Sequence, residues 1–170
     1  TADDGEQVTV TFQKRKATTI AKDGKWMVRL GPLKAGGPFT MTISGKNTIE
    51  LKNILVGEVW VASGQSNMEW PVKSSLDAET HIANSRDPMI RLFTVPRKTA
   101  LNPLSEAEGS WVECGPETVG DFSAVAYFFG RELRKALNVP IGLIDSSWGG
   151  TRVQAWTATR YLEYTLEHRK

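Results

Sequence analysis

The pattern of apolar and polar residues divides the chain into two parts. Residues 7–55 alternate apolar and polar side chains in short runs, and sequences typical of tight turns separate these runs. The expected strands cover residues 8–12, 18–20, 26–30, 39–43 and 48–51. The turn sequences are Asp23-Gly24, Gly36-Gly37-Pro38 and Ser44-Gly45, and Lys14-Arg15-Lys16 forms a hairpin tip. This pattern predicts a small antiparallel β module over residues 1–55, for which we favour a scaffold role over carbohydrate binding.

From residue 56 onward, apolar strands alternate with segments of helical spacing. In order, the expected elements are a mostly buried strand at 56–63, a helix at 76–85, a strand at 89–95, a loop at 97–110, a short strand or anchored loop at 111–114, a helix at 122–137, a strand at 140–145 and a helix from 157 to about 168. Ser74 or Ser75 is the expected N-cap of the first helix, and Asp121 that of the second. The alternation indicates an α/β domain with a parallel sheet over residues 56–170.

The helix at 122–137 carries a stripe of large apolar residues. Phe122, Val125, Phe129 and Leu133 recur at helical spacing, and Arg134 and Lys135 oppose the helix dipole in the last turn. We interpret the aromatic stripe as core packing and not as a cofactor site.

Polar residues follow two of the predicted strands at the point where each strand ends. Gly64-Gln65-Ser66-Asn67 follows the first, and the Gly-x-Ser step resembles the first half of a nucleophile elbow. Met68 stands where that motif would need its last glycine, which argues against an ordinary α/β-hydrolase. If both strands lie parallel in one sheet, both turns emerge at its carboxyl edge, where open α/β sheets bind ligands. Ser66 and the amides of Gly149 and Gly150 would then face one pocket.

Two separated motifs resemble a known family. The segments at 64–70 (Gly-Gln-Ser-Asn-Met-Glu-Trp) and 146–151 (Ser-Ser-Trp-Gly-Gly-Thr), followed by Ala155-Trp156, look like the sialate O-acetylesterase group of SGNH-type serine esterases. The resemblance runs from about residue 8 to about residue 157. It implies a parallel-sheet SGNH (flavodoxin-like) hydrolase core, incomplete in this chain. Members of the group also carry a later Gln-Gly-Glu segment and a still later Asp-x-x-His segment, and this sequence contains neither.

The resemblance also implies chemical roles. Ser66 would be the nucleophile, and its own N–H together with that of Gly149 or Gly150 would bind the oxyanion. The family's third donor, an asparagine, is absent from the chain. The catalytic histidine and its carboxylate would come from outside, on a C-terminal remainder or a second polypeptide. The implied substrate is an acetylated carbohydrate, such as sialic acid or a plant polysaccharide, with no metal or organic cofactor and a secreted or periplasmic location. The alternative is a non-catalytic fragment that binds carbohydrate or serves assembly.

Other candidate residues have weaker support. His81, four residues after Asp77, is a poor candidate for the base, and so is His168 near the end of the sequence. Residues beside the two motifs could contact substrate or merely anchor the turns; these are Gln65, Asn67, Trp70, Trp148, Arg152 and Trp156. Asp145 and Arg152 could pair with each other or bind a substrate carboxylate.

Composition excludes several function classes. The net charge is +2, from 21 basic and 19 acidic residues, which gives no electrostatic reason to expect nucleic acid or an anionic membrane as a partner. The lone Cys114 has no neighbouring metal-ligand spacing and is expected to be a structural thiol. A phosphate-binding role is disfavoured, because the glycine-rich turn lacks a P-loop lysine. No apolar run is long enough to cross a bilayer.

Overall fold

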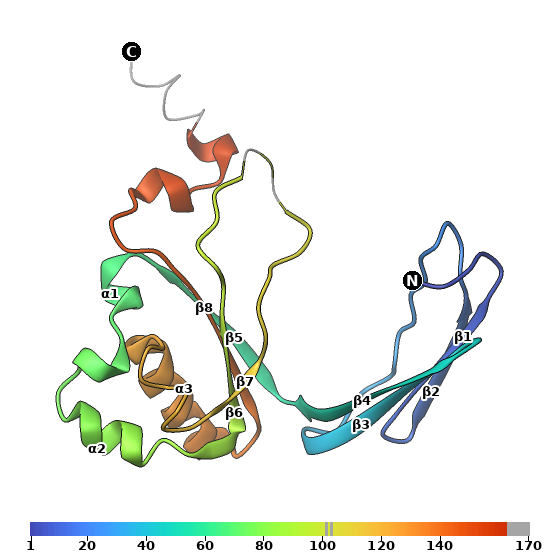
Figure 1. Ribbon diagram of the computed structural model, residues 1–170, viewed down its shortest axis with the longest axis horizontal. Coiled ribbons are helices and arrows are strands. Elements are labelled where there is room, and N and C mark those ends of the chain that lie inside the picture. The colour runs from blue at the N-terminus through green and yellow to red at the C-terminus, as the bar shows by residue number, and fades with distance from the viewer. Residues whose placement is uncertain (101, 103, 163–170) are drawn as a thin grey trace. The chain divides into compact units, whose positions relative to one another are not determined.

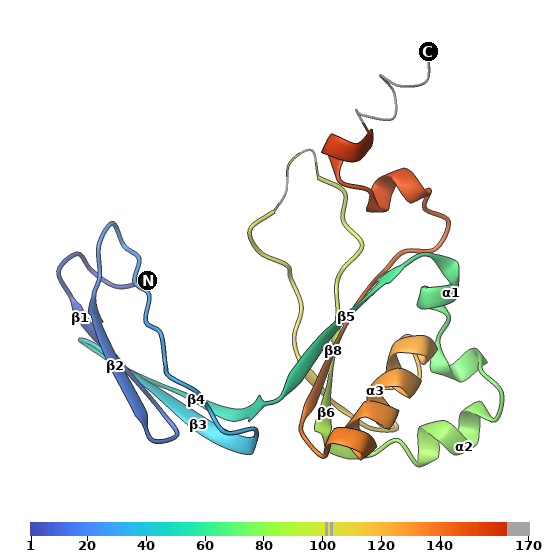
Figure 2. The same cartoon turned by 180° about the vertical axis from the view of Figure 1, so that it is seen from behind.

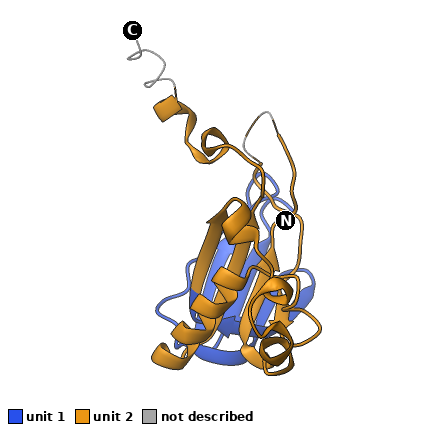
Figure 3. Cartoon of the chain, turned by 90° about the vertical axis from the view of Figure 1, so that its left-hand side faces the viewer, with its two compact units in different colours: residues 1–58 blue, residues 59–170 orange. Residues whose placement is uncertain are grey.

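The computed structural model describes residues 1–100, 102 and 104–162. The chain forms two compact units, Thr1–Glu58 and Val59–Lys170 (Figure 3). Strand β4 (Thr48–Val56) continues past residue 55, where the sequence pattern placed the boundary. Each unit has its own sheet, and each is described separately below.

The first unit is a four-stranded sheet in the order β2-β1-β3-β4. Its strands are β1 (Gln7–Phe12), β2 (Arg15–Ile20), β3 (Gly36–Ser44) and β4. All the pairings are antiparallel, as the alternating pattern predicts. Along β1, Val8, Val10 and Phe12 are buried while the residues between them are more exposed. Phe12 also packs edge to face against Phe39 at a ring-centre distance of 5.8 Å.

Three details of the predicted β module are wrong. The hairpin tip is Gln13-Lys14 and not Lys14-Arg15-Lys16, because Arg15 and Lys16 already pair with β1. Residues 26–30 do not form a strand, and the connection that contains them is held by side-chain bonds further along, at Lys34. The Gln13 side chain donates to the Lys34 carbonyl at 2.8 Å and accepts from the Lys34 N–H at 3.0 Å. Gly36-Gly37-Pro38 is not a turn either, since it begins β3, where the register with β4 shifts between Gly36 and Phe39.

The second unit combines a mainly parallel sheet with α-helices. Its elements are β5 (Glu58–Gly64), α1 (Ser66–Glu69), a 3-10 turn (Val72–Ser74), α2 (Ala78–Ala83), β6 (Asp87–Thr94), β7 (Val112–Cys114), α3 (Ala124–Leu137), β8 (Ile141–Ser147) and a second 3-10 turn (Val153–Trp156). The strand order is β5-β8-β6-β7, with β6 and β8 parallel and β7 antiparallel to β6. The predicted α/β architecture is confirmed.

The helices α1, α2 and α3 all lie on the same side of this sheet (Figures 1 and 2). The core beneath them is built from buried side chains of the central strands, including Ile90, Leu92, Ile141 and Leu143, together with Tyr127 of α3. Burying such residues contributes about 1.5–3 kcal/mol each to folding. The close packing of α3 on β8 depends on Gly130, where an added methyl group would lie 2.6 Å from a Leu143 methyl.

The buried face of α3 matches the predicted stripe only in part, since Phe122 is buried and Leu133 packs against the core as predicted. Val125 and Phe129 are 49% and 43% exposed, whereas Ala124, Ala126, Tyr127 and Gly130 are buried. The stripe turns toward β5, where Phe129 packs edge to face on Trp60 at 5.1 Å. The predicted N-cap is also wrong. Ser123 caps α3 by accepting the Ala126 N–H, while Asp121 lies before the helix and pairs with Lys73.

The expected buried strand at 56–63 is exposed along much of its length. Val59, Trp60 and Val61 in β5 are 60%, 44% and 65% exposed. The physical reason is its place at the end of the sheet order, where β8 is its sheet neighbour among the described strands.

The shorter elements follow the predictions with adjusted ends. Helix α2 is shorter than residues 76–85, and its N-cap position is Asp77 rather than Ser74 or Ser75, because the Ser75 hydroxyl bonds to Val72 in the preceding turn. Residues 111–114 contribute the short strand β7, and the described residues of 97–110 form a loop. Residues 159–162 are helical, and the rest of the predicted last helix lies outside the described residues.

Candidate active site

Ser66 lies at the start of α1, directly beyond the end of β5. Gly64 makes this sharp change of direction possible, because its φ of +146° lies in a region that side-chain-bearing residues rarely adopt. The N–H groups of Met68 and Glu69 then donate to the Gln65 carbonyl, which closes the short helix. The Ser66 residue is exposed, and its hydroxyl donates to the Gln65 side-chain oxygen at 2.9 Å.

The turn after β8 lies next to Ser66. The Trp148 N–H donates to the Gly64 carbonyl at 2.9 Å, so the ends of β5 and β8 are joined. A methyl group added to Gly149 would lie 3.7 Å from the Ser66 Cα. The structure therefore brings together the serine and the glycine turn that the two sequence motifs supply.

A pocket of about 490 Å³ opens at this edge of the sheet. It is lined by the last residues of β6 and β8, by residues that follow β5, β6 and β8, and by one residue that precedes α3. These are Ser66, Glu69, Trp70, Pro71, Lys73, Thr94, Val95, Arg97, Asp121, Asp145, Ser147, Gly149 and Gly150. The location is the carboxyl edge at which open α/β sheets bind their ligands.

Glu69 connects the segments around this pocket. One of its carboxylate oxygens accepts the Gly149 N–H, and the other accepts a hydrogen bond from the Arg97 guanidinium. The Glu69 side chain is 27% exposed and that of Arg97 is 52% exposed. The carboxylate thus links the helix that carries Ser66 to the turn after β8 and to the loop after β6.

Asp145 is a buried acid in the pocket wall, only 7% exposed. Burial raises the pKa of its carboxyl group, and hydrogen bonds from Ser147 together with the positive charge of Arg97 oppose that rise. The Ser147 N–H donates to the carboxylate at 3.1 Å. No ion pair joins Asp145 to Arg152 among the described residues, and the positive charge that acts on Asp145 is that of Arg97.

The weaker sequence candidates have different positions. Gln65 and Asn67 are exposed beside Ser66, and Arg152 is exposed beyond the glycine turn. The Trp148 carbonyl accepts from the Thr151 hydroxyl, which in turn accepts from the Trp156 indole. Trp70 lines the pocket, and its indole N–H donates to the Ser74 carbonyl at 3.0 Å.

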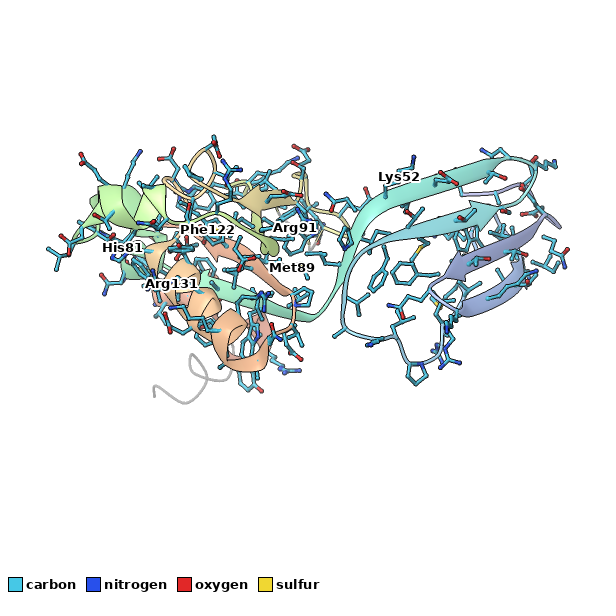
Figure 4. The ribbon with its side chains drawn as sticks, turned by 90° about the horizontal axis from the view of Figure 1, so that it is seen from below. Lys52, His81, Met89, Arg91, Phe122 and Arg131 are labelled. Carbon is cyan, nitrogen blue, oxygen red and sulfur yellow. The ribbon has the colours of Figure 1, made fainter. Side chains whose placement is uncertain are left out.

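His81 lies in another part of the unit. Its ring packs edge to face on Phe128 at 4.9 Å, and its Nδ1 is 3.5 Å from an Arg131 guanidinium nitrogen (Figure 4). It is not among the residues that line the Ser66 pocket. His168 lies outside the described residues.

Cys114 is buried, and its thiol donates to the Ser85 carbonyl at 3.3 Å. Burial raises the pKa of this thiol to about 12, which suits a structural group and opposes a nucleophilic one. Across the described ranges, no group of three or more His, Cys, Asp and Glu residues could hold a metal ion. Within those same ranges, no helix has the length and apolarity needed to span a bilayer.

Comparison with known proteins decides the family. Residues 56–168 match the family described as carbohydrate esterase, sialic acid-specific acetylesterase. The chain belongs to this family. It is 36% identical to the sialate O-acetylesterase of Mus musculus over 180 residues, which cover 94% of this chain and 33% of that protein. The human sialate O-acetylesterase is also 36% identical, with 94% of this chain and 34% of that protein covered.

A solved structure in the comparisons has the same fold. The crystal structure of a carbohydrate acetylesterase from Xanthomonas citri matches with a TM-score of 0.89 and 36% sequence identity. The match covers 95% of this chain and 38% of that chain. The resemblance inferred from the two motifs is therefore confirmed. The chain spans about a third of the length of the curated acetylesterases it matches.

Sequence reasoning missed part of this acetylesterase-family site. In the sequence, Glu69 belongs to the first motif without a role of its own, and Arg97 lies in a loop without periodicity. Lys73, Asp121 and Ser147 also line the pocket without having been assigned to it. For Glu69, its place one helical turn after Ser66 was the available signal. Arg97 offered none, because only the fold brings it to the pocket.

Proposed function

We propose that this chain carries the nucleophile half of a serine esterase that removes O-acetyl groups from carbohydrates through an acetyl-enzyme intermediate. The observation that carries the proposal is the position of Ser66 beside the glycine turn at 149–150, at the mouth of the pocket. The family relationship supports the ester chemistry. Sialic acid or an acetylated polysaccharide is the proposed source of the acetyl group.

In the proposed reaction, the Ser66 oxygen attacks the acetyl carbonyl carbon while a histidine takes the serine proton. The tetrahedral oxyanion is held by the Ser66 N–H and by an N–H of the glycine turn. When the intermediate collapses, the histidine returns the proton to the leaving sugar oxygen. Water then attacks the acetyl-enzyme by the same route and releases acetate and free Ser66.

The histidine and its carboxylate partner are proposed to come from outside this sequence, on a C-terminal remainder or a second polypeptide. His81 is a poor alternative, because its ring is engaged with Phe128 and Arg131 away from the pocket-lining residues. A serine hydroxyl without a base is a weak nucleophile. We therefore expect little esterase activity from this chain alone.

The alternative function is a non-catalytic fragment that binds carbohydrate or serves assembly. The exposed apolar residues of β5 favour an assembly role, because Val59 and Val61, which are 60% and 65% exposed, offer apolar surface on which further protein could pack. A fragment of this kind would keep the pocket without an activated serine.

Labelling by a fluorophosphonate, read by intact-mass spectrometry, tests the proposal. We expect the complete enzyme to gain one label on Ser66 and the Ser66→Ala variant to gain none and to lose hydrolysis while staying folded. Ser63→Ala is the matched control, since Ser63 is an exposed serine of β5 that does not line the pocket. Hydrolysis retained in Ser66→Ala would end the assignment.

The same measurement on the 170-residue chain alone separates the two functions. No labelling of the folded chain, with labelling of the complete enzyme, supports a base supplied from outside. Labelling of the isolated chain would contradict an external base and direct attention to His81 or His168. If neither sample is labelled, the non-catalytic alternative holds.

A further inference from the structure

The carboxylate of Glu69 accepts a hydrogen bond from the Gly149 N–H, one of the two glycine amides that could hold the oxyanion. Its Oε2 accepts the Gly149 N–H, and its Oε1 accepts from Arg97. A main-chain N–H has a single proton to donate. While it donates to Glu69, the Gly149 amide therefore cannot hold an oxyanion.

Glycine at position 149 is what permits this contact. A methyl group added there would collide with the Glu69 Oε2 atom. A residue without a side chain is required here, because the carboxylate lies close to the backbone and the Ser66 Cα is also nearby. By contrast, a methyl group added to Gly150 would meet no heavy atom within 4 Å, so no neighbouring group packs against the Cα of Gly150 in that direction.

We propose that Glu69 is a positioning residue that fixes the Gly149 turn against Ser66, and that the Gly150 N–H is the glycine donor to the oxyanion. This inference rests on the proposed function, since it assigns roles in the same reaction. It assigns the oxyanion donor to one of the two glycine amides, and it assigns a structural role to the glutamate of the first motif.

Arg97 completes the arrangement. An unpaired carboxylate next to the site where negative charge develops would oppose formation of the oxyanion. The Arg97 guanidinium lies on the second oxygen of Glu69 and offsets that charge. The same contact ties the loop after β6 to the helix that carries Ser66.

The first experiment does not depend on activity. Hydrogen–deuterium exchange of the peptide containing residues 147–151, measured by mass spectrometry on the complete enzyme, reports whether the Gly149 amide is protected. We expect faster exchange in Glu69→Ala and near-normal exchange in Glu69→Gln, whose amide oxygen can still accept the N–H. Glu117→Ala is the matched control, because Glu117 forms an exposed ion pair with Arg86 at 3.1 Å.

The second experiment separates positioning from substrate binding. Because misplacing a reacting group by about 1 Å can cost on the order of 100-fold, we expect Glu69→Ala to lower kcat by roughly that factor. KM should change far less, since Glu69 acts through the turn and not on the sugar. Glu69→Gln should recover a large part of the lost kcat, and Glu117→Ala should match the unsubstituted enzyme.

The outcomes distinguish this inference from the proposed function. Unchanged exchange at 147–151 in Glu69→Ala, with normal labelling of Ser66, would overturn the inference alone. A kcat that rises in Glu69→Ala would also overturn it, because Glu69 would then be blocking a catalytic donor. If Ser66 is not labelled in the unsubstituted enzyme, the proposed function fails and the oxyanion assignment fails with it.

Discussion

The main-chain N–H of Trp148 donates a 2.9 Å hydrogen bond to the carbonyl oxygen of Gly64. This bond joins the last residue of β5 to the residue that follows β8, although more than eighty positions separate them in the sequence. It holds the turn that carries Ser66 beside the turn that carries Gly149. The geometry of the candidate site therefore depends on the pairing of these two strand ends.

Gly64→Ala should distort that pairing. Its φ of +146° is strained for alanine, and such a residue costs about 1–3 kcal/mol. We expect a lower melting temperature and slower fluorophosphonate labelling of Ser66 in the complete enzyme. Gly120→Ala is the control, because its added methyl group would make only an ordinary 3.7 Å contact with Ile82. Equal labelling rates in the two variants would contradict the role given to Gly64.

Ser123→Ala should destabilise the second unit more than Asp121→Ala. The Ser123 hydroxyl accepts the Ala126 N–H at 3.2 Å and donates to the Met68 carbonyl at 2.6 Å, so it caps α3 and ties it to α1. Losing a cap and a second hydrogen bond should together lower the free energy of unfolding by about 2 kcal/mol.

The Asp121→Ala substitution tests the prediction from sequence that Asp121 is the N-cap of α3. Its side chain is 84% exposed, so Asp121→Ala should change the free energy of unfolding by less than about 0.5 kcal/mol. Urea unfolding followed by tryptophan fluorescence measures both variants. The assignment of Ser123 as the cap is wrong if Asp121→Ala proves the more damaging of the two.

Asp145→Asn should stabilise the protein in a pH-dependent way. Burial raises the pKa of this carboxyl group above its ordinary 3.8, so the folded state favours the protonated form. The group's favourable contribution is complete below pH 3.8 and is lost as the pH rises through the higher folded-state pKa. At pH 7 the buried, charged carboxylate lowers the stability of the folded state. Asparagine removes this charge, and the asparagine amide oxygen can still accept the Ser147 N–H.

Melting temperatures measured from pH 3 to pH 8 check this sign. We expect Asp145→Asn to melt higher than the unsubstituted protein at pH 7 and the difference to shrink toward pH 3. Asp121→Asn serves as the control for a carboxylate on the exposed side of the same pocket. A gain that grows as the pH falls would contradict the raised pKa of Asp145.

Much of the fold follows from local pattern. The alternation in β1, the helical spacing before Leu137 and the turn at Asp23-Gly24 are consequences of side-chain period and backbone preference, so the sequence shows them directly. Predictions from local sequence pattern were wrong where tertiary contacts outweigh local preferences. The apolar composition of residues 56–63 predicts that Trp60 is buried, yet β5 lies at the end of the sheet order and Trp60 is 44% exposed. Asp121 looked like a cap, yet α3 begins after Ser123.

The candidate site shows the same division. Residue type and spacing are enough to predict a serine after one strand, a glycine pair after another, and the family to which both belong. In contrast, the hydrogen bond from the Gly149 N–H to Glu69 and the pairing of Glu69 with Arg97 are visible only in the folded chain. Those contacts join residues from the ends of three strands, and no local pattern encodes which ends meet. The arrangement of strands in the sheet does so, because strand direction sets which loops share the carboxyl edge and strand order sets which of those loops are neighbours.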